Sequence, residues 1–250
     1  MTPSSGLQLD LPKIDKVYEC FAALETVHAN QGGLLLLYGS LDAPGIAAAM
    51  AANVAGVASL GLEPDAAVAK LALRAGVCDF VVNSLDEGLR ILKNEVRQHR
   101  AASVVVTEAA EVALPEIVAR GVQPDISTLA VPELIERGTR MLRAGARSET
   151  GGTWAVTWSV QHEPMRWLPK LDVLAAKSIG KIDTIPDGRV RWLEAAPRYL
   201  GRMFAGQRYL RMTDAEADRF VRTFEAAVSS GEIGVAVSVT RDGKLMVFET

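Results

Sequence analysis

The sequence predicts a doubly wound α/β fold, a parallel sheet with helices on both faces, followed by a smaller α+β part. Two observations lead to this prediction. Apolar segments of strand length alternate with helical segments between residues 33 and 145. After a stretch rich in Gly, Ser and Thr at 144–153, the segments become alternating strands with β-branched and aromatic residues. We therefore expect an N-terminal helix in 1–30, the α/β domain in 31–147 and the α+β part in 153–250.

The elements of the α/β domain follow from the spacing of its apolar residues. Strands are expected at 34–38, 57–62, 80–82, 103–106 and 126–128, and helices at 44–55, 65–75, 85–98, 109–120 and 132–144. Because these strands are apolar throughout, both faces of the sheet must be covered, which favours parallel strands joined by helices. Residues 13–30 repeat apolar positions every three or four residues, as an amphipathic helix does. Ser84 is expected to cap the helix that follows it.

The α+β part begins with T-W-A-V-T-W-S-V at 153–160, whose alternation predicts a strand. Helices are expected near 164–178, 190–204 and 214–229. Thr213 and Glu216 have the spacing of a capping box at the start of the last of these helices. Two strands that meet at Asp242–Gly243 predict a closing β-hairpin, because Asp-Gly favours the tight turn between paired strands.

Charge and composition narrow the classes of function. With a net charge of −3 and a pI near 5.7, the chain does not attract nucleic acid or anionic membrane through its overall field. No apolar run reaches the roughly 20 residues that span a bilayer, and the N-terminus lacks the layout of a signal peptide, so a cytoplasmic protein is expected. Cys20 and Cys78 stand outside any metal-binding spacing, so we expect buried thiols and no metal site. A homo-oligomer or a protein partner is compatible with this composition.

The turn after the first predicted strand is the candidate binding site. In dinucleotide-binding folds this turn and the N-terminus of the next helix contact the pyrophosphate, and an acidic residue about 20 positions later binds the ribose. The corresponding residues here are candidate cofactor-binding residues. They are Gly39, Ser40, Asp42, Gly45 and, at the end of the second strand, Glu63.

Three motifs carry a resemblance to a known family. They are L-D-E-G-L-R at 85–90, L-P-E-I-V-A-R-G-V at 114–122 and Q-P-D-I-S-T at 123–128. With the segment that begins at G-G-L-L-L-L-Y-G, they make residues 33–128 resemble the Rossmann-like NAD domain of urocanase (urocanate hydratase). The resemblance implies a tightly bound NAD whose nicotinamide adds to the substrate as an electrophile, so that water can add across an imidazole-propenoate.

The sequence departs from the family pattern at the first turn. Where urocanases have a cluster of glycines, this chain has S-L-D-A-P at 40–44. An Asp42 carboxylate at a helix N-terminus would repel a phosphate by about 1 to 4 kcal/mol at 4 Å. Two interpretations follow: Asp42 caps the helix with Pro44 in its first turn, or an NAD site survives in an altered pose. The cofactor is accordingly none or NAD, and no catalytic residue is assigned.

Three hypotheses of function remain open. The first is a urocanase-related binding or partner-interaction protein without hydratase activity. The second is an NAD-dependent hydratase or lyase, or one subunit of it, in which Tyr199 and Arg202 replace missing parts of the active site. The third is a phosphate or nucleic-acid binder that uses arginines among the aromatic residues of 189–211. These arginines are Arg198, Arg202, Arg208 and Arg211; His162 and Glu163, at a strand end, are given no mechanism.

Overall fold

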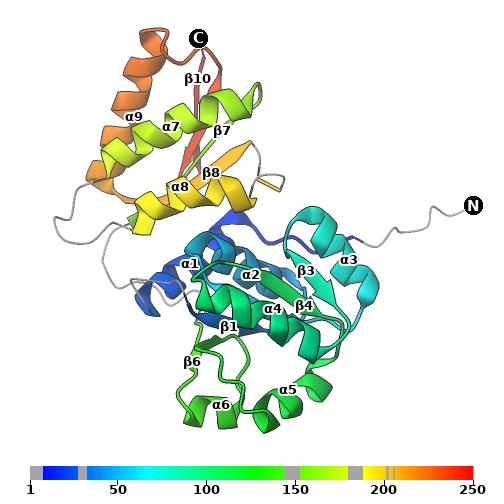
Figure 1. The fold of residues 1–250 in the computed structure, drawn as a ribbon. Coiled ribbons are helices and arrows are strands. Elements are labelled where there is room, and N and C mark those ends of the chain that lie inside the picture. Colours follow the sequence, from blue (N-terminus) through cyan, green and yellow to red (C-terminus); the bar gives the residue numbers. More distant parts are fainter. Residues whose placement is uncertain are drawn as a thin grey trace, which may run out of the picture. The chain divides into compact units, whose positions relative to one another are not determined.

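The chain divides into two compact units, Met1–Ala146 and Arg147–Thr250, and each is built around its own sheet (Figure 1). The computed structural model describes residues 8–27, 33–143, 153–179, 188–200, 203–204 and 206–249. The first unit is a parallel α/β sheet and the second an antiparallel sheet with helices, so the predicted fold class is confirmed.

The sheet of the first unit has six strands in the order β3-β4-β2-β1-β5-β6. All its neighbouring strands are parallel, and Leu37 of β1 lies between Leu60 of β2 and Ser127 of β5. The strands are β1 (Leu35–Tyr38), β2 (Ala58–Leu62), β3 (Phe80–Val82), β4 (Ser103–Val106), β5 (Ile126–Ser127) and β6 (Arg140–Met141). β2, β4 and β3 lie on one side of β1, with β4 between β2 and β3, and β5 pairs with the other side of β1. The direction of winding therefore reverses between β1 and β5.

In the described part of the first unit, six helices cover or connect these strands. They are α1 (Ile14–Val27), α2 (Ala43–Ala55), α3 (Ala66–Ala75), α4 (Leu85–Arg97), α5 (Ala110–Ala119) and α6 (Pro132–Glu136). Side chains cap several N-termini: Asp65 caps α3, and Ser84 caps α4 as predicted. α1 packs on α2, whose residues from Gly45 to Val54 are buried between α1 and the sheet.

One predicted helix is wrong in its extent. The helix expected at 132–144 ends at Glu136, and Arg140–Met141 forms strand β6 beside β5. Gly138 has a φ of +109°, outside the right-handed helical region, so the helix cannot continue through it. Two residues later the chain is extended and adds an edge strand.

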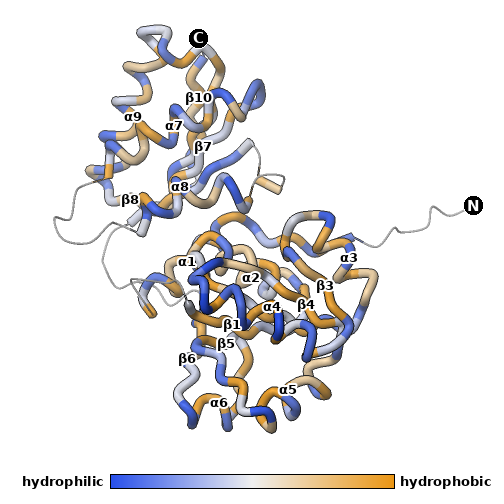
Figure 2. Tube along the Cα trace, viewed as in Figure 1, coloured by the Kyte–Doolittle hydropathy of each residue, from blue (hydrophilic) through white to orange (hydrophobic). Residues whose placement is uncertain are grey.

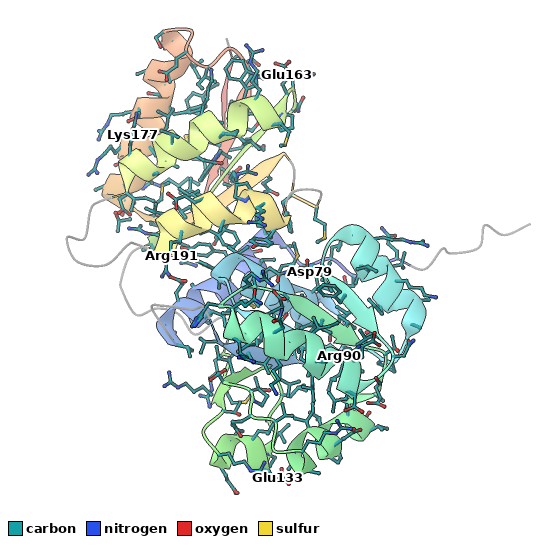
Figure 3. All side chains as sticks on the ribbon, in the orientation of Figure 1. Asp79, Arg90, Glu133, Glu163, Lys177 and Arg191 are labelled. Atoms are coloured by element: carbon teal, nitrogen blue, oxygen red, sulfur yellow. The ribbon has the colours of Figure 1, made fainter. Side chains whose placement is uncertain are left out.

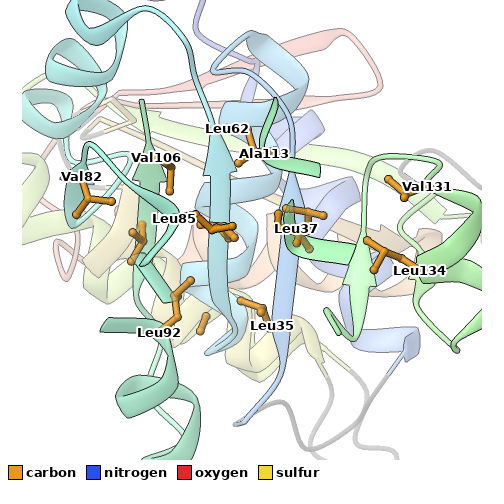
Figure 4. Close-up of a cluster of buried hydrophobic side chains, with 14 residues drawn as sticks. Leu35, Leu37, Leu62, Val82, Leu85, Leu92, Val106, Ala113, Val131 and Leu134 are labelled. Atoms are coloured by element: carbon orange, nitrogen blue, oxygen red, sulfur yellow. The ribbon is translucent and has the colours of Figure 1, made fainter. Parts of the chain in front are cut away.

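The core of the first unit is apolar and continuous. Figure 4 shows one cluster, in which β-strand side chains such as Leu37 and Val106 meet Leu85 and Leu92 of α4. The cluster also takes in Ala113 of α5. Figure 2 shows hydrophobic residues along β1 and hydrophilic ones along much of α4. The cluster is completed by Leu35, Ala58, Leu60, Leu62, Val82, Val104, Ile117, Val131 and Leu134.

The second unit has a four-stranded antiparallel sheet in the order β10-β9-β7-β8. The strands are β7 (Thr153–Val160), β8 (Gln207–Thr213), β9 (Val237–Arg241) and β10 (Lys244–Phe248). The helices are α7 (Pro164–Ser178), α8 (Gly188–Leu200) and α9 (Asp214–Ser229). α9 lies on one face of the sheet, with ring centroids 5.1 Å apart for Trp158–Phe220 and 4.9 Å for Phe224–Phe248.

Most predicted elements of the second unit are confirmed, including β7, the capping box of Thr213 and Glu216, and the hairpin at Asp242–Gly243. Of the helix expected at 190–204, α8 covers the part up to Leu200, and residues 201–202 lie outside the described residues. Strand β8 was not predicted. The alternation of polar and apolar residues in β8 is hard to recognise in the sequence, because Arg208 occupies a position that faces the core side of the sheet. The ion pair between Arg208 and Asp172 makes that position possible.

Candidate functional site

A cavity of about 450 Å³ lies at the carboxyl ends of the strands of the first unit. It is formed where the winding of the sheet reverses, between the loops after β1 and β5, and where α2 and α5 begin. In open α/β sheets this reversal point is the usual place for a ligand. The cavity is lined by Gly39, Ser40, Asp42, Pro44, Gly45, Leu62, Pro64, Ala109, Ala110, Glu111, Thr128 and Leu129.

Asp42 is the N-cap of α2. Its backbone is extended, and its Oδ1 accepts a hydrogen bond from the backbone N–H of Gly45 at 2.9 Å. Pro44 lies in the first turn, where its missing N–H costs no helical hydrogen bond. The interpretation of Asp42 as a helix cap is thus confirmed. The carboxylate stands where the N–H groups and dipole of α2 would otherwise face an anion.

The two glycines of the turn serve contacts within the chain. A Cβ on Gly45 would lie 1.9 Å from the backbone oxygen of Ser40, so no larger residue fits unless the turn moves. A Cβ on Gly39 would lie 3.2 Å from Leu129 Cδ2, across the cavity wall formed by the β5 loop. Close packing of the turn on itself therefore explains Gly45 without a ligand.

Glu63 joins the first turn to the second. Its side chain is 6% exposed, and Oε2 accepts the N–H of Leu41 at 2.8 Å. Oε1 accepts the N–H of Asp65 at 2.9 Å, at the entrance of α3. Both carboxylate oxygens are thus committed to backbone groups. The sequence predicted this acid as a ribose ligand, and the geometry gives it a role in holding two loops together.

The cavity combines negative charge with hydroxyl groups. Asp42 and Glu111 bring carboxylates, and Ser40 and Thr128 bring hydroxyls from the loops after β1 and β5. Next to the lining residue Ala109, Glu108 holds one carboxylate oxygen, Oε2, that is buried without a hydrogen-bond partner among the described residues. Local patterns did not single out the β4 and β5 loops, because only the strand order places them beside the first turn.

The arginines of the 189–211 region make contacts inside the second unit. Arg208 Nε lies 2.9 Å from Asp172 Oδ2, Arg189 pairs with Glu216 at 2.7 Å, and Arg211 donates to the backbone oxygen of Thr153. Arg198 lies over the ring of its neighbour Tyr199, with 5.4 Å from Cζ to the ring centroid. Arg202 lies outside the described residues.

The remaining candidate groups are exposed or unreactive. Glu163, with φ +49°, begins α7 and pairs with Arg166, both more than half exposed; Figure 3 shows it at the opposite end of α7 from Lys177. His162 beside it is exposed. Burial raises the pKa of the Cys20 thiol to about 11 and that of Cys78 to about 12, so both are protonated and poor nucleophiles near neutral pH.

No three His, Cys, Asp or Glu side chains of the described residues gather as they would around a metal ion. Within the same residues, every helix is too short or too polar to cross a membrane.

The first unit is thus a Rossmann-like α/β domain with a cavity at the reversal point of its sheet. Residues 14–131 match the family model of the urocanase Rossmann-like domain, in agreement with the resemblance that the sequence motifs indicate. The match includes α1 and extends to the loop that follows β5.

A solved structure of a hypothetical protein from Thermus thermophilus is 19% identical and covers 54% of this chain and 74% of that one. Its TM-score is 0.30, which is too low to support an argument about fold or function.

Proposed function

We propose that this chain is a urocanase-related binding protein without urocanate hydratase activity, and that its cavity takes a ligand other than a dinucleotide. The hydrogen bond from Gly45 N–H to the Asp42 carboxylate carries the proposal. A pyrophosphate held at the first turn would need the place and the N–H donors that this carboxylate uses. The residues of the turn therefore do not fit an NAD bound in the way that the family implies.

The Asp42 carboxylate occupies the place of a phosphate, and its charge adds an electrostatic cost to the binding of that phosphate. Two unit charges 4 Å apart repel by about 1 kcal/mol in water and about 4 kcal/mol near a protein surface. Asp42 is exposed to solvent, so the lower value applies. A cost of about 1 kcal/mol corresponds to about a fivefold loss of affinity. The phosphate would also lack the N–H of Gly45, which already donates to the Asp42 carboxylate.

Glu63 supports the same proposal from the other end of the dinucleotide. A ribose ligand needs a carboxylate oxygen free to accept from two hydroxyls. Here both oxygens accept backbone N–H groups, from Leu41 and Asp65. Glu63 is buried and is not among the residues that line the cavity, so to reach a ribose its carboxylate would have to turn away from the buried N–H of Leu41, which costs about 1–3 kcal/mol.

The class of ligand follows from what lines the cavity. Carboxylates of Asp42 and Glu111, two hydroxyls and apolar surface from Leu62 and Leu129 favour a small neutral or positively charged molecule. A volume of about 450 Å³ lies within the usual range for such sites. The hydroxyls of Ser40 and Thr128 can orient a polar group without adding charge.

The family match favours one alternative, an NAD-dependent hydratase or one subunit of such an enzyme. It would require Asp42 and Glu63 to exchange their present hydrogen bonds for contacts with NAD. Binding of phosphate or nucleic acid through the arginine cluster has no comparable support, because Arg189, Arg208 and Arg211 contact carboxylates and backbone oxygens of their own unit.

The decisive experiment measures NAD in and on the purified protein. Mass spectrometry after denaturation should find no stoichiometric NAD, and calorimetric titration with NAD should show no binding. Asp42→Gly removes both the charge and the side-chain cap at little cost to the helix, and it frees the N–H of Gly45, so it should gain measurable affinity for NAD or inorganic pyrophosphate. Co-purified NAD in the unmodified protein would overturn the proposal and establish the alternative.

Glu111→Gln is the matched control, since it removes a carboxylate from the same cavity but leaves the N-terminus of α2 unchanged. This variant should bind NAD no better than the unmodified protein. A thermal-shift panel of amines and guanidinium compounds tests the ligand class. Both variants should lose any stabilisation that these cations give, whereas stabilisation by anions alone would contradict the class we propose.

A further inference from the structure

The edge strand β10 offers unpaired backbone groups on one side. It pairs with β9 through a two-residue turn, and Lys244 lies opposite Arg241 next to that turn. In such a hairpin the pair beside the turn exchanges hydrogen bonds, and alternate residues point their N–H and C=O groups to the other side. The backbone groups of Leu245 and Val247 therefore face away from β9, and β10 is the last strand of the described sheet on that side.

The side chains of the same two residues are apolar and exposed. Leu245 is 60% exposed and Val247 is 53% exposed. They lie on the sheet face opposite to Phe248, which packs on Phe224 of α9. An apolar pair in water at a sheet edge is the usual sign of a surface that another strand covers.

The residues of the neighbouring strands favour a partner that adds at the edge over one that covers the whole face. Thr240 and Ser238 of β9 lie opposite Leu245 and Val247 and are the next residues on that face. On the next strand, β7, Thr157 pairs with Thr240 and Ser159 pairs with Ser238, so the same face continues with hydroxyl-bearing residues. A partner that covered the whole face would meet hydroxyl-bearing side chains, whereas one that adds at the edge meets leucine and valine on this face.

β10 also lacks the devices that keep edge strands apart. The four residues between Lys244 and Glu249 are Leu, Met, Val and Phe, with no charge, proline or glycine among them. Lys244 begins the strand and Glu249 follows its last residue, and both are exposed. Antiparallel pairing of two such strands brings the lysine end of one beside the glutamate end of the other.

We propose that β10 is the interface of a symmetric dimer, in which two copies of this chain pair their β10 strands antiparallel about Met246. In this register, Leu245 of each copy lies opposite Val247 of the other, and their outward N–H and C=O groups form the hydrogen-bonded pairs. The apolar side chains join into one strip on the outer face. The two four-stranded sheets become one continuous sheet of eight strands.

The oligomeric state tests the interface. Sedimentation equilibrium of the full chain should give a dimer, and Val247→Lys should raise the dissociation constant at least tenfold, because it places two charges against apolar residues. Met165→Lys is the matched control: Met165 on α7 is 84% exposed, and its replacement should leave the dimer unchanged. The proposal is overturned if the chain is a monomer at a protein concentration of about 100 µM. It is also overturned if the dimer dissociates no more readily after Val247→Lys.

Disulfide trapping tests the register and does not depend on a destabilising variant. Directly opposite residues in a non-hydrogen-bonded antiparallel pair have Cα atoms about 4.5 Å apart, within the range that a disulfide spans. Met246→Cys should therefore give a covalent dimer under mild oxidation, and Val247→Cys should not. The native Cys20 and Cys78 are buried and provide no competing thiol. Trapping at position 247 and not at 246 would overturn the register.

Discussion

The buried carboxylates of the two units have different partners. In the first unit, the buried Glu63 accepts hydrogen bonds from two backbone N–H groups, and the exposed Asp125 and Asp79 likewise accept from Leu35 at 2.9 Å and from Ser103 at 2.8 Å. In the second unit, the buried carboxylates of Asp172 and Glu216 each face an arginine, and Glu216 also accepts the N–H of Thr213. Parallel strands joined by helices leave many unpaired N–H groups at strand ends and helix starts, and an antiparallel sheet with hairpins leaves fewer.

This difference changes how much stability the protein loses when a carboxylate is removed. A carboxylate that accepts backbone N–H groups orders loops, and its removal leaves neutral donors unpaired. A carboxylate that faces an arginine neutralises a charge inside the protein, and its removal leaves that charge uncompensated. We therefore expect the larger losses of stability in the second unit and the smaller, site-directed losses in the first.

Asp172→Ala should have the largest effect. Asp172 lies 2.9 Å from Arg208 Nε and also accepts the Trp158 indole N–H at 3.2 Å, and all three side chains are largely buried. Loss of the carboxylate leaves the guanidinium buried without its partner, which costs about 3–5 kcal/mol. All four tryptophans belong to the second unit, so urea unfolding followed by tryptophan fluorescence reports this unit alone.

The double variant Asp172→Leu with Arg208→Met is the control for that prediction. It removes both charges and fills similar volume, so it should recover most of the stability that Asp172→Ala loses. If the double variant is as unstable as the single one, packing around Trp158 and not charge compensation accounts for the loss.

Glu63→Gln should have the next largest effect. An amide has one oxygen, so the side chain can accept from Leu41 or from Asp65 but not from both as the carboxylate does. The N–H that loses its partner costs about 1–3 kcal/mol. Amide hydrogen exchange of Leu41 and Asp65 measures the loss in the first unit directly. Unchanged protection at both amides would contradict the role of Glu63 as a link between the two turns.

Asp42→Ala should cost about 1 kcal/mol, the usual value of an N-cap. The variant removes the bond to Gly45 N–H but leaves the packing of α2 on α1 intact. Asp42→Ser should recover most of the loss because a serine hydroxyl also caps. Thermal unfolding followed by circular dichroism gives the comparison, and a loss as large as that of Glu63→Gln would show that Asp42 does more than cap.

The sequence predicted the parallel sheet and most helix boundaries well, because apolar spacing and caps such as Ser84 are local signals. It failed where a distant contact decides. Strand β8 was missed because its Arg208 is neutralised by Asp172, which is distant in the sequence. The predicted extent of α6 was too long because the positive φ of Gly138 ends the helical conformation although apolar residues follow. Part of the cavity was found from the first turn, but Glu111 belongs to it only through the strand order.

The smallest expected effects concern pH and have opposite signs in the two units. Burial raises the pKa of the Asp172 carboxyl, although Arg208 acts in the other direction. A raised pKa means that the native state of the second unit holds this proton more tightly than the unfolded chain. The protonated Asp172 therefore contributes fully to the free energy of unfolding below the pKa of the unfolded chain, near 3.8. This contribution is lost as the pH rises through the pKa of Asp172 in the folded protein.

Asp86 in the first unit should show the reverse. The hydrogen bond and the positive charge of Arg120 lower the pKa of the Asp86 carboxyl, so its contribution is present above the unfolded pKa and is lost as the pH falls through the folded value. Asp86→Asn should therefore lower stability slightly at pH 7 and not at all at pH 2, and salt should reduce the difference because the pair is exposed. Carboxyl titration by NMR measures both groups in one experiment, and a shift of the same sign for Asp86 and Asp172 would remove the distinction between the two units.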